Sequence, residues 1–272
     1  HKNEISDYFR EASWSEALEF AATGLKSILD IHGGNALAGL GSAKGSNEEA
    51  YAFQKFIRSA LKTNNVDHCT RLCHASSVAA MLEMLGNAGV SNQVEDVALT
   101  EVIVVIGAKP TANHPVAATF MKNATKNGAR LVVIDPYKSD LTRHADFFLQ
   151  FRPDTDVLLM NSMMSVIIEE NLHDERFIKE RTTDFLNLKE VVSKYSPESV
   201  SSTCGIKPET IRAVARLYAK ARSAMIFWGM GISQHIPGTD NARCLISLAL
   251  LTRNIGKKGS GIHPLRGQNN VQ

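Results

Sequence analysis

The stretch of residues 66–77 contains the side chains whose types and spacing are best suited to chemistry. It holds two of the four cysteines, Cys69 and Cys73, and two of the nine histidines, His68 and His74. A thiol beside an imidazole, just before a helix, is where a thiolate is easily stabilised, and a thiolate is a soft metal ligand. Cysteine is also often a small core residue, and composition alone favours that interpretation. A zinc site is a further alternative, although no second Cys/His pair follows at finger-like spacing.

The composition is that of a globular protein large enough to bury a sizeable core. The chain has 272 residues, of which 44% are hydrophobic and 21% are charged. This length permits one large domain or two modest ones. The formal net charge is +2 and there is no long basic run, so no polyanionic partner such as a nucleic acid is indicated. Four cysteines do not suggest a disulfide framework, and no apolar run reaches the length of a membrane span.

Helix-capping signals and glycines outline the elements on the N-terminal side of residues 66–77. Two serine-initiated capping boxes predict helices over residues 13–31 and 46–61. Residues 36–40 are a short apolar run that predicts a buried strand. The small-residue loop 41–45 follows it, and its backbone N–H groups could face an anion. The full phosphate-loop spacing is absent, so an ordinary connection is the simpler interpretation.

The remainder of the chain alternates buried strands with helices. Residues 101–107 form a continuous β-branched run, typical of a parallel strand covered on both faces, and residues 131–134 repeat this pattern after a helix. Apolar runs at 145–151 and 224–227 predict two more strands, and the tail 259–270 is predicted to be a loop. This order predicts a doubly wound, mostly parallel, Rossmann-like α/β domain that is preceded by part of a second α/β domain.

The polar stretch before residue 66 is the predicted domain boundary. Residues 1–65 are then a partial α/β domain, the first half of a discontinuous one. Residues 66–272 are a dinucleotide-binding-like α/β domain that carries both the Cys/His stretch and the polar tail. The chain starts at His1 without a methionine and ends in a polar run, so we expect a central piece of a longer protein.

Two features fall beyond the carboxyl ends of the predicted strands, where ligands of doubly wound sheets bind, and a third lies in the predicted tail loop. Asp135 ends the second strand, where an acidic residue often holds a ribose or a base, although a turn or helix-cap role is equally consistent. Gly229 and Gly231 follow the strand 224–227 and allow the backbone to approach a ligand closely. The Arg266 guanidinium is a fixed-charge fork able to hold a carboxylate. The dinucleotide glycine fingerprint is absent, so a nicotinamide site is not supported.

Taken together, these segments resemble the molybdenum- and tungsten-dependent formate dehydrogenases of the molybdopterin oxidoreductase family along nearly the whole chain. Residues 64–74 are similar to the active-site loop of that family. The resemblance implies that Cys73 is the metal ligand and that His74 is the adjacent histidine. Residues 264–272 are similar to the segment that carries the substrate arginine, here Arg266. The Cys-His pair together with Arg-Gly-Gln-Asn-Asn is specific to formate dehydrogenases, because several relatives place serine, aspartate or a lone cysteine at the metal.

The cofactor of that family is a molybdenum or tungsten ion held by two molybdopterin guanine dinucleotides. The resemblance implies cofactor contacts in the loop 41–47 and at the ends of the predicted strands. The implied residues are Ser42, Lys44, Gly45, Asn47, Gly107, Asn113, His114, Asp135, Pro136, Pro153, Asp154, Asp156, Gly229, Met230, Gly231, Gln234, Gly267 and Gln268. Two departures affect cofactor detail and not the reacting centre, since Lys44 and Tyr137 stand where the family frequently has arginine.

The implied reaction is the oxidation of formate to carbon dioxide with transfer of two electrons to the metal. Arg266 would bind the formate carboxylate through paired charge-assisted hydrogen bonds, and the Cys73 thiolate would ligate the metal. His74 would accept the proton or orient the substrate C–H bond, with its pKa tuned by the metal and by Arg266.

The resemblance also implies partners and a context. The family has an N-terminal iron–sulfur domain and works with electron-transfer subunits that are iron–sulfur, NAD-linked or hydrogenase-linked. We therefore expect formate and such subunits as partners, no nucleic acid, no membrane segment in this chain, and the bacterial cytoplasm rather than the periplasm. The iron–sulfur cluster is expected only in the missing N-terminal part, so the chain alone is expected to be inactive.

Two alternatives come from different functional classes. One is a cofactor-less homologue that serves as a scaffold in a respiratory complex, and the other is another oxidoreductase of the family, such as a nitrate reductase. The presence of Cys73, His74 and Arg266 argues against both.

Overall fold

The computed structural model describes residues 9–268 and forms two compact units, one that ends at Arg71 and one that begins at Leu72. The structure thus moves the domain boundary from the predicted residue 65 to residue 71. The reason is that Val66–His68 forms strand β2, which pairs in parallel with β1 (Gly39–Gly41) of the first unit. Two of the three residues of β2 are exposed, so it lacks the apolar run that predicts a buried strand.

The first unit is a small α/β unit. Its elements are α2 (Trp14–His32), η1 (Gly34–Ala36), β1, α3 (Asn47–Lys55), the π-helical segment η2 (Phe56–Ala60) and β2. Both predicted helix starts are confirmed, because Ser13 caps α2 and Ser46 caps α3 in a complete capping box. The predicted strand is shifted along the chain to Gly39–Gly41, and Leu37, Ile57 and Leu61 form the buried core of the unit.

The second unit is built on one sheet of five strands. These are β3 (Val102–Ile106), β4 (Arg130–Ile134), β5 (Phe147–Leu149), β6 (Ala224–Trp228) and β7 (Gly261–Pro264). Their order across the sheet is β5-β4-β3-β6-β7, and every pairing is parallel. This order, in which the chain winds outward from β3 first to one side and then to the other, confirms the predicted doubly wound domain.

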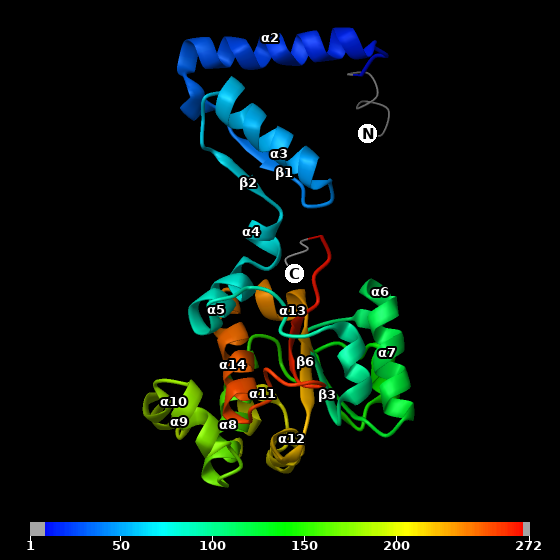
Figure 1. Cartoon of the computed structure of the whole chain (residues 1–272), viewed down its shortest axis with the longest axis vertical. Helices are drawn as coiled ribbons and strands as arrows, with labels where there is room; N and C mark the ends of the chain where they lie inside the picture. Colours follow the sequence, from blue (N-terminus) through cyan, green and yellow to red (C-terminus); the bar gives the residue numbers. More distant parts are fainter. Residues whose placement is uncertain (1–8, 269–272) are drawn as a thin grey trace. The chain divides into compact units, whose positions relative to one another are not determined.

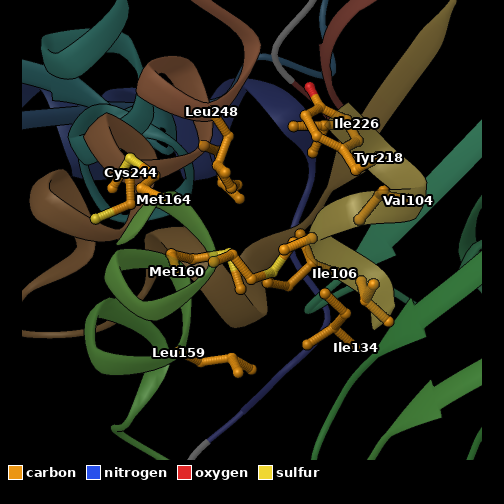
Figure 2. Close-up of a cluster of buried hydrophobic side chains, with 14 of the residues drawn as sticks. Val104, Ile106, Ile134, Leu159, Met160, Met164, Tyr218, Ile226, Cys244 and Leu248 are labelled. Carbon is orange, nitrogen blue, oxygen red and sulfur yellow. The ribbon is translucent and has the colours of Figure 1, made fainter. Parts of the chain in front are cut away.

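Helices cover both faces of this sheet, with α7 on one side and α8 and α14 on the other (Figure 1). One face packs against α5 (Ala75–Leu85), α8 (Asp156–Glu169), α12 (Pro208–Lys220) and α14 (Gly238–Leu251), and the opposite face against η3 (Val94–Leu99), α7 (Pro115–Lys126) and η4 (Asp140–His144). Successive strand residues point to opposite faces, so Val104 lies in the first core and Val105 in the second. Figure 2 shows the first core, where Val104 and Ile226 lie across from Met160 and Leu248.

Short helices account for most of the remaining chain. They are α4 (Thr70–Cys73), α6 (Pro110–Asn113), α9 (Glu175–Arg181), α10 (Phe185–Val192), α11 (Pro197–Cys204) and α13 (Met230–Ser233). Helices α4, α6, α11 and α13 were not predicted. Over the part of the chain that the structure describes, no helix combines the length and the apolar character that crossing a membrane requires.

The strand β7 corrects the prediction of a loop over residues 259–270. Its four residues are buried and pair with β6, although glycine, histidine and proline give them no strand signature. A proline is tolerated there because β7 is an edge strand of the sheet. The third predicted strand, 145–151, is confirmed only over Phe147–Leu149.

Candidate active site

Two glycine turns meet at the carboxyl ends of β3 and β6, the point where the strand order reverses. The Gly107 carbonyl oxygen accepts a hydrogen bond from the Gly231 N–H at 3.0 Å. A Cβ atom on Gly107 would lie 2.8 Å from the Gly231 carbonyl carbon, and Gly107 has a φ of +55°. These glycines therefore allow a close approach between two turns of the chain itself, at the crevice where ligands of such sheets bind, and the predicted approach to a ligand stays a prediction.

This contact predicts a stability cost for Gly231→Ala. Its Cβ would lie 2.8 Å from the Cα and carbonyl oxygen of Gly107, which are backbone atoms that cannot rotate away. Overpacking of this kind is expected to lower the free energy of unfolding by about 1–3 kcal/mol, measured by urea unfolding. Gly24→Ala in α2 is the control, because a Cβ there meets nothing within 4 Å, and it should be neutral or stabilising. Equal losses in both variants would contradict the prediction.

Cys73 ends α4, and its half-buried thiol contacts the thioether of Met230 at the start of α13. The Sγ–Sδ distance is 3.4 Å, although the two residues are 157 positions apart in the sequence. Gln234, which follows α13, donates from Nε2 to the Leu72 carbonyl oxygen at 2.9 Å. The predicted metal ligand is thus brought together with two of the predicted cofactor residues.

His74 is fully buried, and both nitrogens of its ring have hydrogen-bond partners. Nε2 lies 3.2 Å from the Leu265 carbonyl oxygen, and Nδ1 lies 3.0 Å from the Ser233 Oγ. Because a carbonyl can only accept, Nε2 carries the proton and Nδ1 accepts from the Ser233 hydroxyl. Burial lowers the pKa of His74 to about 4, and the charge of Arg266 adds to this effect. Burial therefore favours the neutral form of His74, and the hydrogen bonds at both ring nitrogens define the orientation of the ring.

Arg266 lies just beyond β7, beside the same residues. Its guanidinium donates to the Ala88 carbonyl oxygen, and its own carbonyl oxygen accepts from His114 Nε2 at 2.9 Å. Burial lowers the pKa of the Arg266 guanidinium, and the negative charge that Cys73 can carry opposes this shift. The three predicted catalytic residues, Cys73, His74 and Arg266, therefore converge beyond the carboxyl ends of β6 and β7.

Carboxylates gather beyond the carboxyl ends of β4 and β5. Asp135 accepts a hydrogen bond from the Tyr137 N–H at 2.7 Å, and burial raises its pKa. Asp156 is only 3% exposed, burial raises its pKa, and its Oδ1 atom finds no hydrogen-bond partner within residues 9–268. Asp154 is exposed and lies 2.8 Å from the His235 ring. A buried carboxylate oxygen without a donor is costly, so Asp156 suits a bound group that brings N–H donors.

The predicted cofactor loop of the first unit borders a cavity of about 660 Å³. Ser42, Lys44 and Gly45 line it together with Gly41 and His68, the last residues of β1 and β2. The loop is tightly turned, because the Lys44 N–H donates to the Ser42 Oγ at 3.1 Å. The cavity therefore lies at the carboxyl ends of two parallel strands. Another predicted residue, Asn47, begins α3 and is not among the residues that line the cavity.

Of the other predicted cofactor residues, Asn113 ends α6, and the rest lie in segments that follow the strands. Asn113, Pro153 and Gly267 are exposed, whereas Pro136 and Gln268 are half-buried. The end of the predicted arginine segment lies outside the described residues: Asn269, Asn270, Val271 and Gln272. From Phe9 to Gln268, no three His, Cys, Asp or Glu side chains are grouped so that they could hold a metal ion.

Three residues of the site were not predicted from the sequence. The indole Nε1 of Trp228 donates to the Ser77 Oγ at 2.9 Å, and the hydroxyl oxygens of Ser77 and Ser233 are 2.6 Å apart. A serine near a helix start, a serine at a helix end and a tryptophan at a strand end carry no specific signal. The partners are separated by 151 and 156 positions, so no local pattern could have identified them.

His263 on β7 is a second buried imidazole, and it gives a pH dependence of stability. Its ring packs against Phe227 at a centroid distance of 5.2 Å, and burial lowers its pKa to about 4. The unfolded chain has the ordinary pKa of about 6.5, so between these values the unfolded state binds more protons. The stability that neutral His263 contributes is therefore present above pH 6.5 and is lost as the pH falls toward 4.

His263→Gln should make the loss of stability on acidification shallower by up to about 1.4 kcal/mol per pH unit between pH 6.5 and 4. Urea unfolding at a series of pH values measures the slope, and replacement of the exposed His32 serves as the control. An unchanged slope in His263→Gln would be inconsistent with a depressed pKa at this residue.

Comparisons with known proteins agree on one family. Residues 4–271 match the sequence model of the family described as molybdopterin oxidoreductase. The chain is 44% identical over 264 residues to the "F420-dependent formate dehydrogenase subunit alpha" of Methanocaldococcus jannaschii, which covers 97% of this chain and 38% of that protein. It is 42% identical over 261 residues to "Formate dehydrogenase H" of Escherichia coli, covering 96% of this chain and 36% of that protein. The chain thus spans little more than a third of the length of these relatives.

A solved structure has the same fold. The acetylene hydratase from Pelobacter acetylenicus matches with a TM-score of 0.81 and 24% sequence identity. The match covers 93% of this chain and 34% of that one. At this level of identity the likeness concerns the arrangement of helices and strands.

Proposed function

Because the chain belongs to the molybdopterin oxidoreductase family, we propose that it is part of an enzyme that oxidises formate to carbon dioxide. The observation that carries this proposal is the convergence of Cys73, His74 and Arg266 beyond the carboxyl ends of β6 and β7. A guanidinium fork suits a small carboxylate, and a neighbouring thiol suits a soft metal. The names of the relatives as formate dehydrogenases support formate as that carboxylate.

The proposed cofactor is a molybdenum or tungsten ion held by two pterin guanine dinucleotides. When bound, this group supplies a metal that takes up two electrons. Cys73 would be the protein ligand of that metal, since a thiolate is a soft donor. The buried Oδ1 of Asp156 fits a guanine base, because guanine presents N–H donors. In the first unit, the Lys44 ammonium beside the 660 Å³ cavity suits an anionic group of a dinucleotide.

The side chains of this chain would bind and orient the substrate. Oxidation of formate breaks its C–H bond and releases carbon dioxide, one proton and two electrons. Arg266 would hold the carboxylate through paired N–H donors and so fix the direction of the C–H bond. His74 would keep its proton on Nε2, which donates a hydrogen bond to the Leu265 carbonyl oxygen, so its neutral ring would orient the substrate.

Further parts of the enzyme are proposed from the relatives. One relative is named an alpha subunit, which supports electron-transfer subunits as partners. An iron–sulfur cluster would belong to a part of the protein that this sequence does not include. The chain covers 38% of that relative, so we expect formate turnover only from a protein of the relative's full length. The bacterial cytoplasm stays a prediction.

The test combines composition with turnover in the full-length protein. Elemental analysis for molybdenum and tungsten, and release of the pterin, are measured together with formate-dependent dye reduction. One metal with two pterins and reduction by formate would support the proposal. Turnover with nitrate but not formate would replace the proposed substrate. A protein without metal and pterin, and without turnover, would point to the scaffold homologue and overturn the proposal.

A further inference from the structure

A line of four buried hydrogen bonds runs through the site and ends on His74. It begins at the indole Nε1 of Trp228, which is 2.9 Å from the Ser77 Oγ, and continues over 2.6 Å to the Ser233 Oγ. The Ser233 Oγ is 3.0 Å from His74 Nδ1, and His74 Nε2 is 3.2 Å from the Leu265 carbonyl oxygen. No side chain in this line is more than 5% exposed. The line is therefore shielded from water along its length.

For a neutral His74 ring, the chemistry of the end groups determines the direction of every bond in this line. The Leu265 carbonyl can only accept, so the neutral ring of His74 carries its proton on Nε2 and accepts at Nδ1. The single proton of Ser233 is then used on Nδ1, and Ser77 must donate to the Ser233 Oγ. The Trp228 indole can only donate, and it fills an acceptor position of Ser77. Each donor has one acceptor, and the arrangement is compatible with one tautomer of His74.

These residues come from four elements that other contacts hold together. Ser77 is on α5, Ser233 ends α13, Trp228 ends β6, and Leu265 follows β7. The Leu265 N–H donates to the Trp228 carbonyl oxygen at 2.7 Å. The Ser76 hydroxyl donates to the Ser233 carbonyl oxygen at 2.6 Å, which fixes the backbone of α13 against α5. The hydroxyl of Ser233 is therefore aimed at the ring by backbone on both sides.

We propose that Ser233 and Ser77, anchored by Trp228, are positioning residues that hold His74 in the Nε2–H tautomer with its ring fixed beside Cys73. The hydrogen-bond geometry by itself supports the fixed tautomer. The consequence for catalysis rests on the proposed function, in which His74 orients the substrate. A ring bound at both nitrogens cannot rotate without breaking a buried hydrogen bond and leaving a buried polar group unsatisfied, which is unfavourable.

Nitrogen NMR of the chain labelled with 15N-histidine tests the tautomer without any cofactor. His74 is assigned by its disappearance in His74→Gln. We expect a protonated, pyrrole-type Nε2 and a pyridine-type Nδ1 whose resonance is shifted by the hydrogen bond from Ser233. In Ser233→Ala the Nδ1 resonance should move to the position of a pyridine-type nitrogen without that bond, and Ser233→Thr should restore it.

The control is Ser162→Ala, which removes another buried hydroxyl, one without a hydrogen-bond partner in the described part of the chain. It should leave the His74 resonances unchanged. A proton on Nδ1 in the wild-type chain, or an Nδ1 resonance unaffected by Ser233→Ala, would overturn the proposal. If circular dichroism shows that Ser233→Ala does not fold, Ser77→Ala tests the same line of hydrogen bonds one bond further from His74. An unchanged Nδ1 resonance of His74 in Ser77→Ala would then overturn the proposal.

Kinetics of the full-length, cofactor-loaded protein test the catalytic consequence. Ser233→Ala should lower kcat about 10- to 100-fold, as is usual when a residue that orients an active-site ligand is removed. The KM for formate should stay unchanged because Arg266 is untouched, and Ser233→Thr should recover kcat. An unchanged kcat in Ser233→Ala would overturn the positioning role. If the wild-type protein does not oxidise formate, the proposed function fails, but the NMR result still decides the tautomer.

Discussion

Replacement of Arg266 by alanine is expected to raise the KM for formate about 100-fold, with a much smaller change in kcat. The charge of the Arg266 guanidinium interacts electrostatically with both His74 and Cys73. Its loss removes two charge-assisted hydrogen bonds to a small anion that has few other groups to bind. Steady-state dye reduction at a range of formate concentrations in the full-length protein measures both constants.

Two further variants separate charge from geometry at this position. Arg266→Lys keeps the positive charge but loses the planar fork, so its KM should lie between those of wild type and Arg266→Ala. Arg222→Ala is the matched control, since its exposed guanidinium pairs with Glu101 at the amino ends of the strands. An Arg266→Ala protein with the KM of wild type would exclude Arg266 from substrate binding.

Cys73→Ala is expected to lower the metal content and to reduce formate turnover by roughly 100-fold or more. Removal of a residue that merely orients a metal ligand already costs about 10- to 100-fold, and removal of the ligand itself should cost at least as much. Elemental analysis of the purified full-length variant gives the metal content per chain, and dye reduction gives the activity. Cys73→Ser should retain less metal than wild type, because a hydroxyl is a harder donor than a thiolate.

Cys69→Ala is the control that the sequence itself provides. Cys69 is also half-buried and lies four positions before Cys73. Metal content and activity should be those of wild type, since the contact with Met230 is made by Cys73. If Cys69→Ala lost the metal and Cys73→Ala kept it, the ligand assignment would be wrong.

The elements that the sequence predicted well are those whose signals are local. Strands β3 and β4 are covered by helices on both faces, so every position favours an apolar side chain and the run is continuous. The caps of α2 and α3 need only a serine and the N–H three residues later. Such patterns are complete within a few residues. The apolar runs of the strands, with helices between them, were therefore sufficient to predict the doubly wound sheet.

Other elements were missed because their stability comes from neighbours. Strand β7 has glycine, histidine and proline among its four residues, and it is a strand because β6 offers an open edge. Strand β2 is mostly exposed and exists through its pairing with β1, which moves the domain boundary to residue 71. Neither has the hydrophobic pattern of a buried strand, so propensity could not reveal it.

By itself the sequence determined the fold class and, through the resemblance, the identity of Cys73, His74 and Arg266 as the residues to examine. Tertiary structure decided how they are arranged. The partners of His74 are 159 and 191 positions away, and Cys73 meets Met230 across 157 positions. The burial that lowers the pKa of His74 and the hydroxyl that holds its ring arise where helix ends and strand ends pack together. Local sequence encodes the elements, but contacts between distant segments exist only after the elements have packed.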